Sequence, residues 1–218
     1  MIEAVVFDMD GVLTDSEPVI NEAAIRGLRE YGVYAEPEDF IPFVGAGEDR
    51  YIGGVAEKYG QPYDVSMKKR VYEIYLDILP TMLRPFTGVT EFLKELAGRN
   101  VTMAVASSAD RVKVTANLRA IGVEFRWFGA IITGEDVEQK KPAPDIYLHT
   151  ARVLGLAPDR CCVVEDAING IEAARAAGMR CVAVAQSFTV AELQEACPDV
   201  IRQCTTDISL DDLFPGKT

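Results

Sequence analysis

The sequence is poor in positive charge and contains only one histidine. Its 22 lysine and arginine residues stand against 34 aspartate and glutamate residues, which gives a formal net charge of −12. An acidic chain repels phosphate backbones and anionic lipids, so nucleic acid and membrane surfaces are poor partners for it. A small anionic ligand is still compatible with this charge, provided that positive side chains or a metal ion gather where it binds.

Long apolar runs and a basic leader are also missing. No stretch approaches the roughly 18 apolar residues of a membrane span. The N-terminus leads directly into an apolar segment that carries Glu3 and Asp8, without the basic region of a signal peptide. The five cysteines are an odd number without a CxxC spacing, and Cys161, Cys162 and Cys181 lie in apolar runs. We therefore expect buried, reduced thiols and a cytoplasmic location.

The sequence does contain a regular alternation of short apolar runs and helical patterns. Strand-like runs occupy residues 4–8, 101–108, 128–136, 161–166 and 180–185, and a segment with helical periodicity follows each of them. Parallel strands need crossover helices of this kind, so the order predicts an α/β fold with a doubly wound parallel sheet. The chain of 218 residues is long enough to bury a sizeable core.

One segment interrupts this alternation after the first predicted strand. Residues 16–85 carry helical patterns without a convincing strand. An insertion of this length predicts a helical cap domain over residues 16–85, while residues 1–15 and 86–218 form the core domain. Ligands of doubly wound sheets bind beyond the carboxyl ends of the strands. The insertion emerges at that edge, so we expect the cap to cover the site as a lid.

Polar residues mark the ends of four predicted strands. They are Asp8 with Asp10, Ser107 with Ser108, Lys140 with Lys141, and Glu165 with Asp166. Each pair alone has an ordinary interpretation, as a helix cap or a solvated face. Together at one sheet edge, the carboxylates form an oxygen-rich site for a hard cation such as Mg²⁺. A hydroxyl and an ammonium group donate to phosphoryl oxygens, so the set predicts phosphoryl transfer.

These segments resemble the four motifs of the haloacid dehalogenase-like (HAD) superfamily. The matching stretches are "DMDGVLTDS", "VASSAD", "KKPAPDIY" and "VVEDAINGIEAARAAG". The best match is the subfamily with a helical cap, which contains phosphatases and β-phosphoglucomutases, and it covers about residues 5–185. The stretches "FVGAGEDRYIGGVA" and "VASSADRVKV" also resemble a HAD domain of larger plant chloroplast proteins. The resemblance implies a Rossmann-like core with an inserted cap.

The resemblance also implies a role for each motif residue. Asp8 would be the nucleophile that forms an aspartyl-phosphate, and Asp10 would protonate the leaving oxygen and then activate water. Ser107 and Lys141 match the hydroxyl of the second motif and the lysine of the third, with Lys140 as a weaker substitute. The Mg²⁺ ligands would be Asp8, the main-chain carbonyl of Asp10, Glu165 and Asp166. Residues 11–15 would form the flap that opens and closes the cap.

The cap departs from the β-phosphoglucomutase pattern. Where mutases carry a histidine in the first cap helix, this sequence has Ile20 and Asn21, and its only histidine, His149, falls in a predicted core helix. The cap turn "GAGEDR" has Glu48 where the mutase cap presents an arginine, with Arg50 two residues later. We therefore predict a phosphatase that hydrolyses a small phosphomonoester, with a β-phosphoglucomutase-type mutase as the alternative. The predicted substrate-binding residues are Gly47, Glu48, Arg50 and Ser108.

Two further alternatives concern the cap and catalysis itself. Arg50 or Lys69 could replace the missing mutase arginine. A regulatory domain that has lost catalysis is also conceivable, but it predicts the loss of at least one motif, and all four are present. We expect a monomer whose partner is a small phosphorylated metabolite, such as a sugar phosphate, and neither nucleic acid nor membrane.

Overall fold

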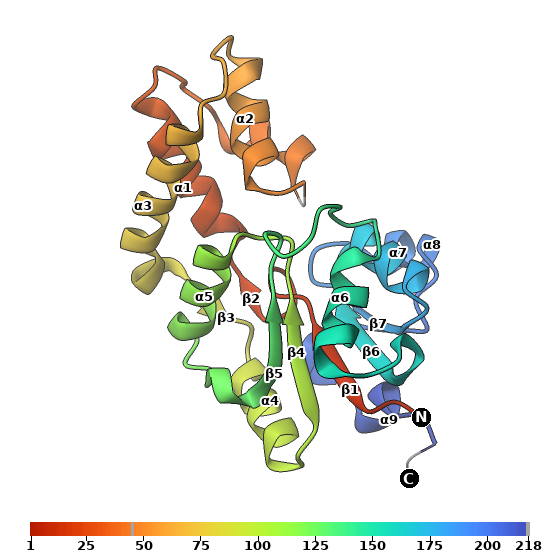
Figure 1. Ribbon diagram of the computed structural model, residues 1–218. Helices are drawn as coiled ribbons and strands as arrows, with labels where there is room; N and C mark the ends of the chain where they lie inside the picture. Colours follow the sequence, from red (N-terminus) through yellow and green to blue (C-terminus); the bar gives the residue numbers. More distant parts are fainter. Residues whose placement is uncertain (45, 217–218) are drawn as a thin grey trace.

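The computed structural model describes residues 1–44 and 46–216. Its centre is a six-stranded sheet with the order β5-β4-β1-β6-β7-β8, in which every neighbouring pair is parallel. The strands are β1 (Ala4–Phe7), β4 (Thr102–Ala106), β5 (Phe128–Ile132), β6 (Cys161–Glu165), β7 (Arg180–Val184) and β8 (Val200–Arg202). This arrangement confirms the predicted α/β fold with a doubly wound parallel sheet (Figure 1).

Helices cover both faces of the sheet and divide its side chains into two cores. The core helices are α4 (Val89–Gly98), α5 (Arg111–Ala120), α6 (Asp145–Leu154), α7 (Ile168–Ala176), α8 (Val190–Glu195) and α9 (Leu210–Leu213). Successive strand residues face opposite sides. Val5 and Phe7 therefore pack into the cluster that includes α4, α5 and the cap, whereas Ala4 and Val6 pack against α6 and α7. Burial on both faces explains why the strands read as continuous apolar runs.

Three elements of the core were not predicted from the sequence: strand β8 and the helices α4 and α9. Strand β8 has three half-buried residues and pairs with β7 at the edge of the sheet. Helix α4 buries Val89, Leu93 and Leu96, a helical spacing that the sequence does contain. Short 3₁₀ segments complete the chain at Pro37–Phe43, Phe125–Trp127, Pro158–Arg160 and Thr205–Asp207.

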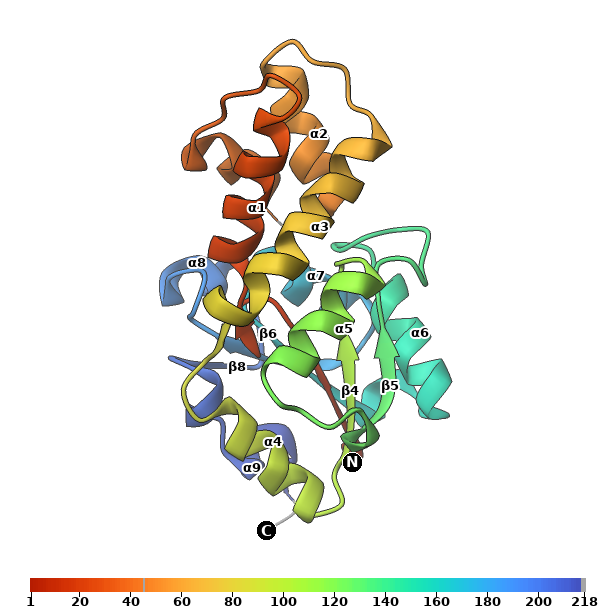
Figure 2. The same ribbon diagram turned by 90° about the vertical axis from the view of Figure 1, so that its left-hand side faces the viewer.

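The described residues of the cap form three α-helices above the carboxyl ends of the strands (Figure 2). They are α1 (Glu17–Arg29), α2 (Glu48–Lys58) and α3 (Val65–Met82), and all three lie within the predicted cap range, 16–85. The two crossings between cap and core pair as a small antiparallel ladder of β2 (Thr14–Asp15) and β3 (Arg84–Pro85). This ladder closes the base of the cap. Among the described residues, no helix combines the length and apolar character that crossing a membrane requires.

Candidate active site

The centre of the sheet brings the motif residues together. Strand β1 lies between β4 and β6, and Phe7 pairs in register with both neighbouring strands. Asp8 and Glu165 directly follow Phe7 and its partner Val164, and Ser107 comes two residues after the other partner, Val105. All three therefore reach the same sheet edge, below the cap. Asp8 is only 7% exposed and Glu165 is almost fully buried. Burial of two neighbouring carboxylates requires a positive partner.

Lys141 supplies that positive partner. Its Nζ lies 2.6 Å from Asp8 Oδ1 and 2.7 Å from Glu165 Oε1, and the side chain is buried. Burial alone would lower the pKa of this ammonium group, but the two carboxylates raise it well above its usual value. Lys140, the other candidate, donates instead to the main-chain carbonyl of Gly134. Lys141 is therefore the lysine that reaches the strand ends.

Glu165 has no free oxygen. Its Oε1 accepts from Lys141 and from the Tyr147 hydroxyl at 3.0 Å. Its Oε2 accepts from the main-chain N–H groups of Asp166 and Ala167, at 2.8 and 2.9 Å, just before helix α7 begins. A Cβ at Gly170 would stand 1.7 Å from Oε1, so only glycine leaves room for this carboxylate. Glu165 thus holds Lys141 and the start of α7 together.

Asp10 lies at the entrance of the cap and both of its oxygens are bonded. The Ser16 hydroxyl donates to Oδ1, and Lys113 Nζ lies 2.8 Å from Oδ2. Between Asp10 and Ser16 the chain turns sharply: Gly11 has φ +80°, and its N–H donates to the carbonyl of Thr14 at 2.9 Å. Lys113, from α5, was not singled out in the sequence, where it reads as one of several charged residues on a surface helix.

Two of the carboxyl groups at the strand ends have raised pKa values. Burial is the main cause that raises the pKa of Asp8 to about 7; Lys141 lowers it, and Glu165 and Asp10 raise it further. Burial also raises the pKa of Asp166 well above its usual value, with Glu165 and Asp8 adding to the effect. It is costly to ionise two buried acids side by side. A cation bound between them would stabilise their ionised forms.

The carboxylates fit a divalent cation in charge, and the predicted ligands are the carboxylates of Asp8, Glu165 and Asp166 with the main-chain carbonyl of Asp10. Within the described part of the chain, Asp8, Asp10, Glu165 and Asp166 face two ammonium groups, those of Lys141 and Lys113. No group of three or more His, Cys, Asp or Glu side chains among the described residues is placed to hold a metal ion. Glu165 and the Asp10 side chain already have protein partners. Asp8, Asp166 and the Asp10 carbonyl are the groups still suited to such an ion.

The two serines occupy the turn after β4. Ser107 is 1% exposed; its N–H donates to the carbonyl of Ile132, which aligns it with β5, and its hydroxyl accepts from the N–H of Ala109 at 3.2 Å. Ser108 is half-buried beside it. A hydroxyl fixed at a strand end, next to Asp8, is suited to bind a phosphoryl oxygen.

The predicted cap residues separate into two groups. Glu48, the first residue of α2, is 6% exposed and its Oε1 lies 3.6 Å from Lys113 Nζ. Gly47 precedes it with φ +84°. Arg50 points elsewhere: its guanidinium pairs with Glu57 at 3.0 Å and its side chain is 57% exposed. Gly45, at the start of the same turn, lies outside the described residues.

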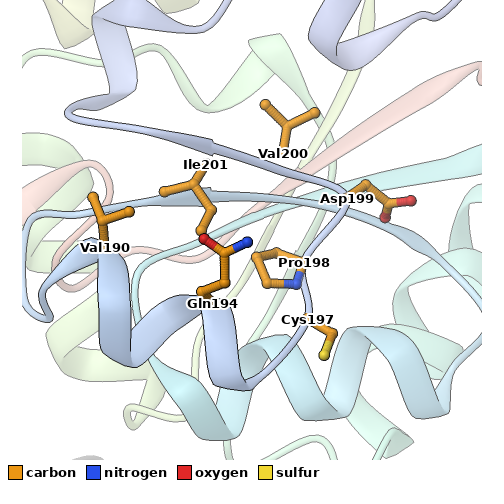
Figure 3. A pocket seen from close by; sticks show the side chains of 7 residues that line it. All are labelled: Val190, Gln194, Cys197, Pro198, Asp199, Val200 and Ile201. Atoms are coloured by element: carbon orange, nitrogen blue, oxygen red, sulfur yellow. The ribbon is translucent and has the colours of Figure 1, made fainter.

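A separate hollow lies at the β8 edge of the sheet. About 360 Å³ in volume, it lies between α8 and β8 (Figure 3). It is lined by Val190, Gln194, Cys197, Pro198, Asp199, Val200 and Ile201. None of these residues belongs to the four motifs, so this hollow is not part of the site at the strand ends.

Comparison with known proteins agrees with the motifs. The sequence pattern of the haloacid dehalogenase-like hydrolases matches residues 5–184. The chain is 43% identical over 99% of its length to a protein of Arabidopsis thaliana called Protein SUPPRESSOR OF QUENCHING 1, chloroplastic, of which it spans only 21%. It is 34% identical to the Phosphorylated carbohydrates phosphatase of Thermotoga maritima, with 82% of each chain covered.

A solved structure agrees with the fold over nearly the whole chain. The crystal structure of CbbY from Rhodobacter sphaeroides in complex with phosphate superimposes with a TM-score of 0.87 and 26% identity. The match covers 98% of this chain and 99% of that one. The similarity therefore includes the cap as well as the sheet.

Proposed function

The chain belongs to the haloacid dehalogenase-like hydrolase family, and from this membership we propose that it is a Mg²⁺-dependent phosphatase that hydrolyses a small phosphomonoester through an aspartyl-phosphate. The observation that carries the proposal is the contact of Lys141 with both Asp8 and Glu165, at 2.6 and 2.7 Å. It fixes a buried carboxylate at a strand end without consuming both of its oxygens. Such a carboxylate is suited to attack phosphorus.

In the first step, an oxygen of Asp8 attacks phosphorus while the bond to the leaving oxygen breaks. Lys141 holds the other oxygen of Asp8 and, with the Ser107 hydroxyl, stabilises charge on the phosphoryl oxygens. The leaving oxygen takes a proton from the carboxyl group of Asp10. The products of this step are the free alcohol and a phosphorylated Asp8.

In the second step, Asp10 accepts a proton from a water molecule that attacks the same phosphorus. The bond between phosphorus and Asp8 breaks, phosphate leaves, and the Asp8 carboxylate is restored. The Ser16 hydroxyl and Lys113 hold the Asp10 carboxylate between the two steps. One carboxyl group thus acts first as acid and then as base.

We assign Mg²⁺ to Asp8, Asp166 and the main-chain carbonyl of Asp10, and assign Glu165 to the support of Lys141. When bound, the ion would neutralise negative charge on the phosphoryl group and on the acids around it. The raised pKa values of Asp8 and Asp166 support this choice. The four hydrogen bonds to Glu165 argue against a direct role for it as a ligand.

A phosphorylated sugar is the substrate class that we favour, because the Thermotoga maritima relative is named a phosphatase of phosphorylated carbohydrates. The cap supports hydrolysis over the mutase alternative. Ile20 is 3% exposed, inside the hydrophobic core, and Asn21 donates to the Tyr51 hydroxyl and the carbonyl of Pro37. Neither residue resembles the histidine of mutases. The three buried thiols suit a reducing compartment such as the cytoplasm.

The test is a phosphate-release screen over sugar phosphates and other small metabolite phosphates, with Mg²⁺ and with excess chelator. An isomerase assay on β-glucose 1-phosphate with a bisphosphate primer runs in parallel. We expect Mg²⁺-dependent phosphate release that Asp8→Asn abolishes. Full turnover after exhaustive chelation would refute the metal dependence, and isomerisation faster than phosphate release would favour the mutase.

A further inference from the structure

Lys113 is a buried lysine that links the candidate acid–base residue to the cap. It lies on α5 and is 5% exposed. Its Nζ is 2.8 Å from Asp10 Oδ2 and 3.6 Å from Glu48 Oε1. Asp10 belongs to the core and Glu48 to the cap helix α2, so a single ammonium group contacts both domains at the site.

The charge of Lys113 persists in this buried position. Its two carboxylate partners, Asp10 and Glu48, lie 2.8 and 3.6 Å from Nζ and offset the cost of burying the ammonium group. An ammonium group between two carboxylates holds both of them, because without it two negative charges would face each other without compensation. The Ser16 hydroxyl holds the other oxygen of Asp10, so the orientation of the Asp10 carboxylate is fully determined.

The cap is docked on the same face of α5 at two further points. Lys68 of α3 lies 3.1 Å from Asp110, which precedes α5. The Tyr75 hydroxyl of α3 donates to Asn117 Oδ1 at 2.6 Å. Helices α3 and α5 lie side by side in both views (Figures 1 and 2). Lys113 is the member of this set that also reaches Asp10.

Glu48 provides an independent sign that the link is functional. Its Oε1 faces Lys113, while its Oε2 is buried and has no hydrogen-bond partner among the described residues. An unpaired buried carboxylate oxygen costs stability unless something donates to it. Packing alone does not explain why the carboxylate of Glu48 is buried at this cost close to Asp10.

We propose that Lys113 is a positioning residue: it orients the Asp10 carboxylate for proton transfer and, through Glu48, makes that orientation depend on the docked cap. The inference rests on the proposed function, since it assigns to Lys113 a part in the proton transfers of Asp10. A lysine that only balanced charge between two domains would support the fold and leave proton transfer untouched.

The test compares two substrates that differ in their need for an acid. The phenolate of p-nitrophenyl phosphate leaves without help, whereas that of phenyl phosphate needs protonation. We measure kcat/KM, which reports the steps through phosphoryl transfer, for the wild type, Lys113→Met and Lys68→Met. The control Lys68→Met removes a cap-docking lysine that does not contact Asp10.

We expect Lys113→Met to lose about tenfold or more in kcat/KM on phenyl phosphate beyond its loss on p-nitrophenyl phosphate. Lys68→Met should lose the same factor on both substrates. Equal losses for Lys113→Met on both substrates would overturn the proposal, because they indicate a structural role only. If Lys113→Met does not fold, Glu48→Gln decides: we expect a smaller loss with the same bias toward phenyl phosphate, and an unbiased effect would contradict the link.

A double variant tests the dependence on the cap. If Glu48 acts through Lys113, adding Glu48→Gln to Lys113→Met should change the substrate bias by less than about twofold. If the substrate bias of the double variant equals the product of the biases of the two single variants, the residues act independently and the coupling is contradicted. Asp8→Asn, assayed on both substrates, separates the two proposals: if it retains hydrolysis, the proposed function fails, whatever Lys113 does.

Discussion

At the residue scale, Lys141 holds together the acidic groups of two strands. Removing its charge would leave Asp8 and Glu165 facing each other in a buried place, with Asp8 no longer oriented. We predict that Lys141→Met lowers kcat by about 10² to 10³, whereas Lys140→Met loses less than about tenfold, because Lys140 bonds the Gly134 carbonyl instead. Steady-state kinetics on p-nitrophenyl phosphate measures both. Equal losses would mean that the third-motif lysine has been misassigned.

The site residues at the strand ends could be predicted from the sequence, but not all of their partners could. Asp8, Ser107 and Glu165 end predicted strands, and the parallel sheet alone brings them to one edge. The partner of Asp10 was not predicted, because Lys113 belongs to a helix and meets Asp10 only through tertiary packing. A signal was present: Lys113 and Asn117 stand four residues apart on a helix face that also buries Val114 and Leu118.

At the element scale, the start of α7 depends on a glycine. A Cβ at Gly170 would lie 1.7 Å from Glu165 Oε1, so Gly170→Ala should displace the carboxylate that supports Lys141. We predict a loss of about 1–3 kcal/mol in the free energy of unfolding together with a large loss of kcat. Urea denaturation and kinetics measure the two effects.

Gly98, the last residue of α4, is the matched control. A Cβ there meets nothing within 4 Å, and alanine is a better helix former than glycine by about 1 kcal/mol. Gly98→Ala should therefore leave kcat unchanged and keep or raise stability. If Gly170→Ala behaved like Gly98→Ala, the glycine would not be needed for the placement of Glu165.

Elements were predictable where their residues alternate or repeat clearly. The five longer strands showed apolar runs, while β8 has only three half-buried residues, too few for a period to appear. The orientation of the cap turn was not predictable either: Glu48 and Arg50 are two residues apart, and the start of α2 turns one inward and the other toward Glu57.

At the scale of the whole molecule, the chain is acidic and negative charge gathers at the site, where a bound cation can neutralise it. Because Asp8 has a pKa raised to about 7 by burial, protons compete with Mg²⁺ for its carboxylate below that pH. The cation binds the ionised form, so the apparent affinity should rise with pH, by about fivefold from about pH 6 to about pH 7 and less above it. Thermal shift during Mg²⁺ titration measures this. Equal half-saturation at both pH values would contradict it.

The central claim is that Asp8 carries the phosphoryl group, and chemical trapping tests it most directly. The wild type and Asp8→Asn are each mixed with a labelled aryl phosphate and Mg²⁺, quenched in acid within a turnover, and digested for mass spectrometry. We predict a phosphorylated peptide containing Asp8 in the wild type and no label in Asp8→Asn, because an amide is a poor nucleophile. A label on another residue, or a variant that keeps hydrolysing within about tenfold of the wild type, would contradict the account.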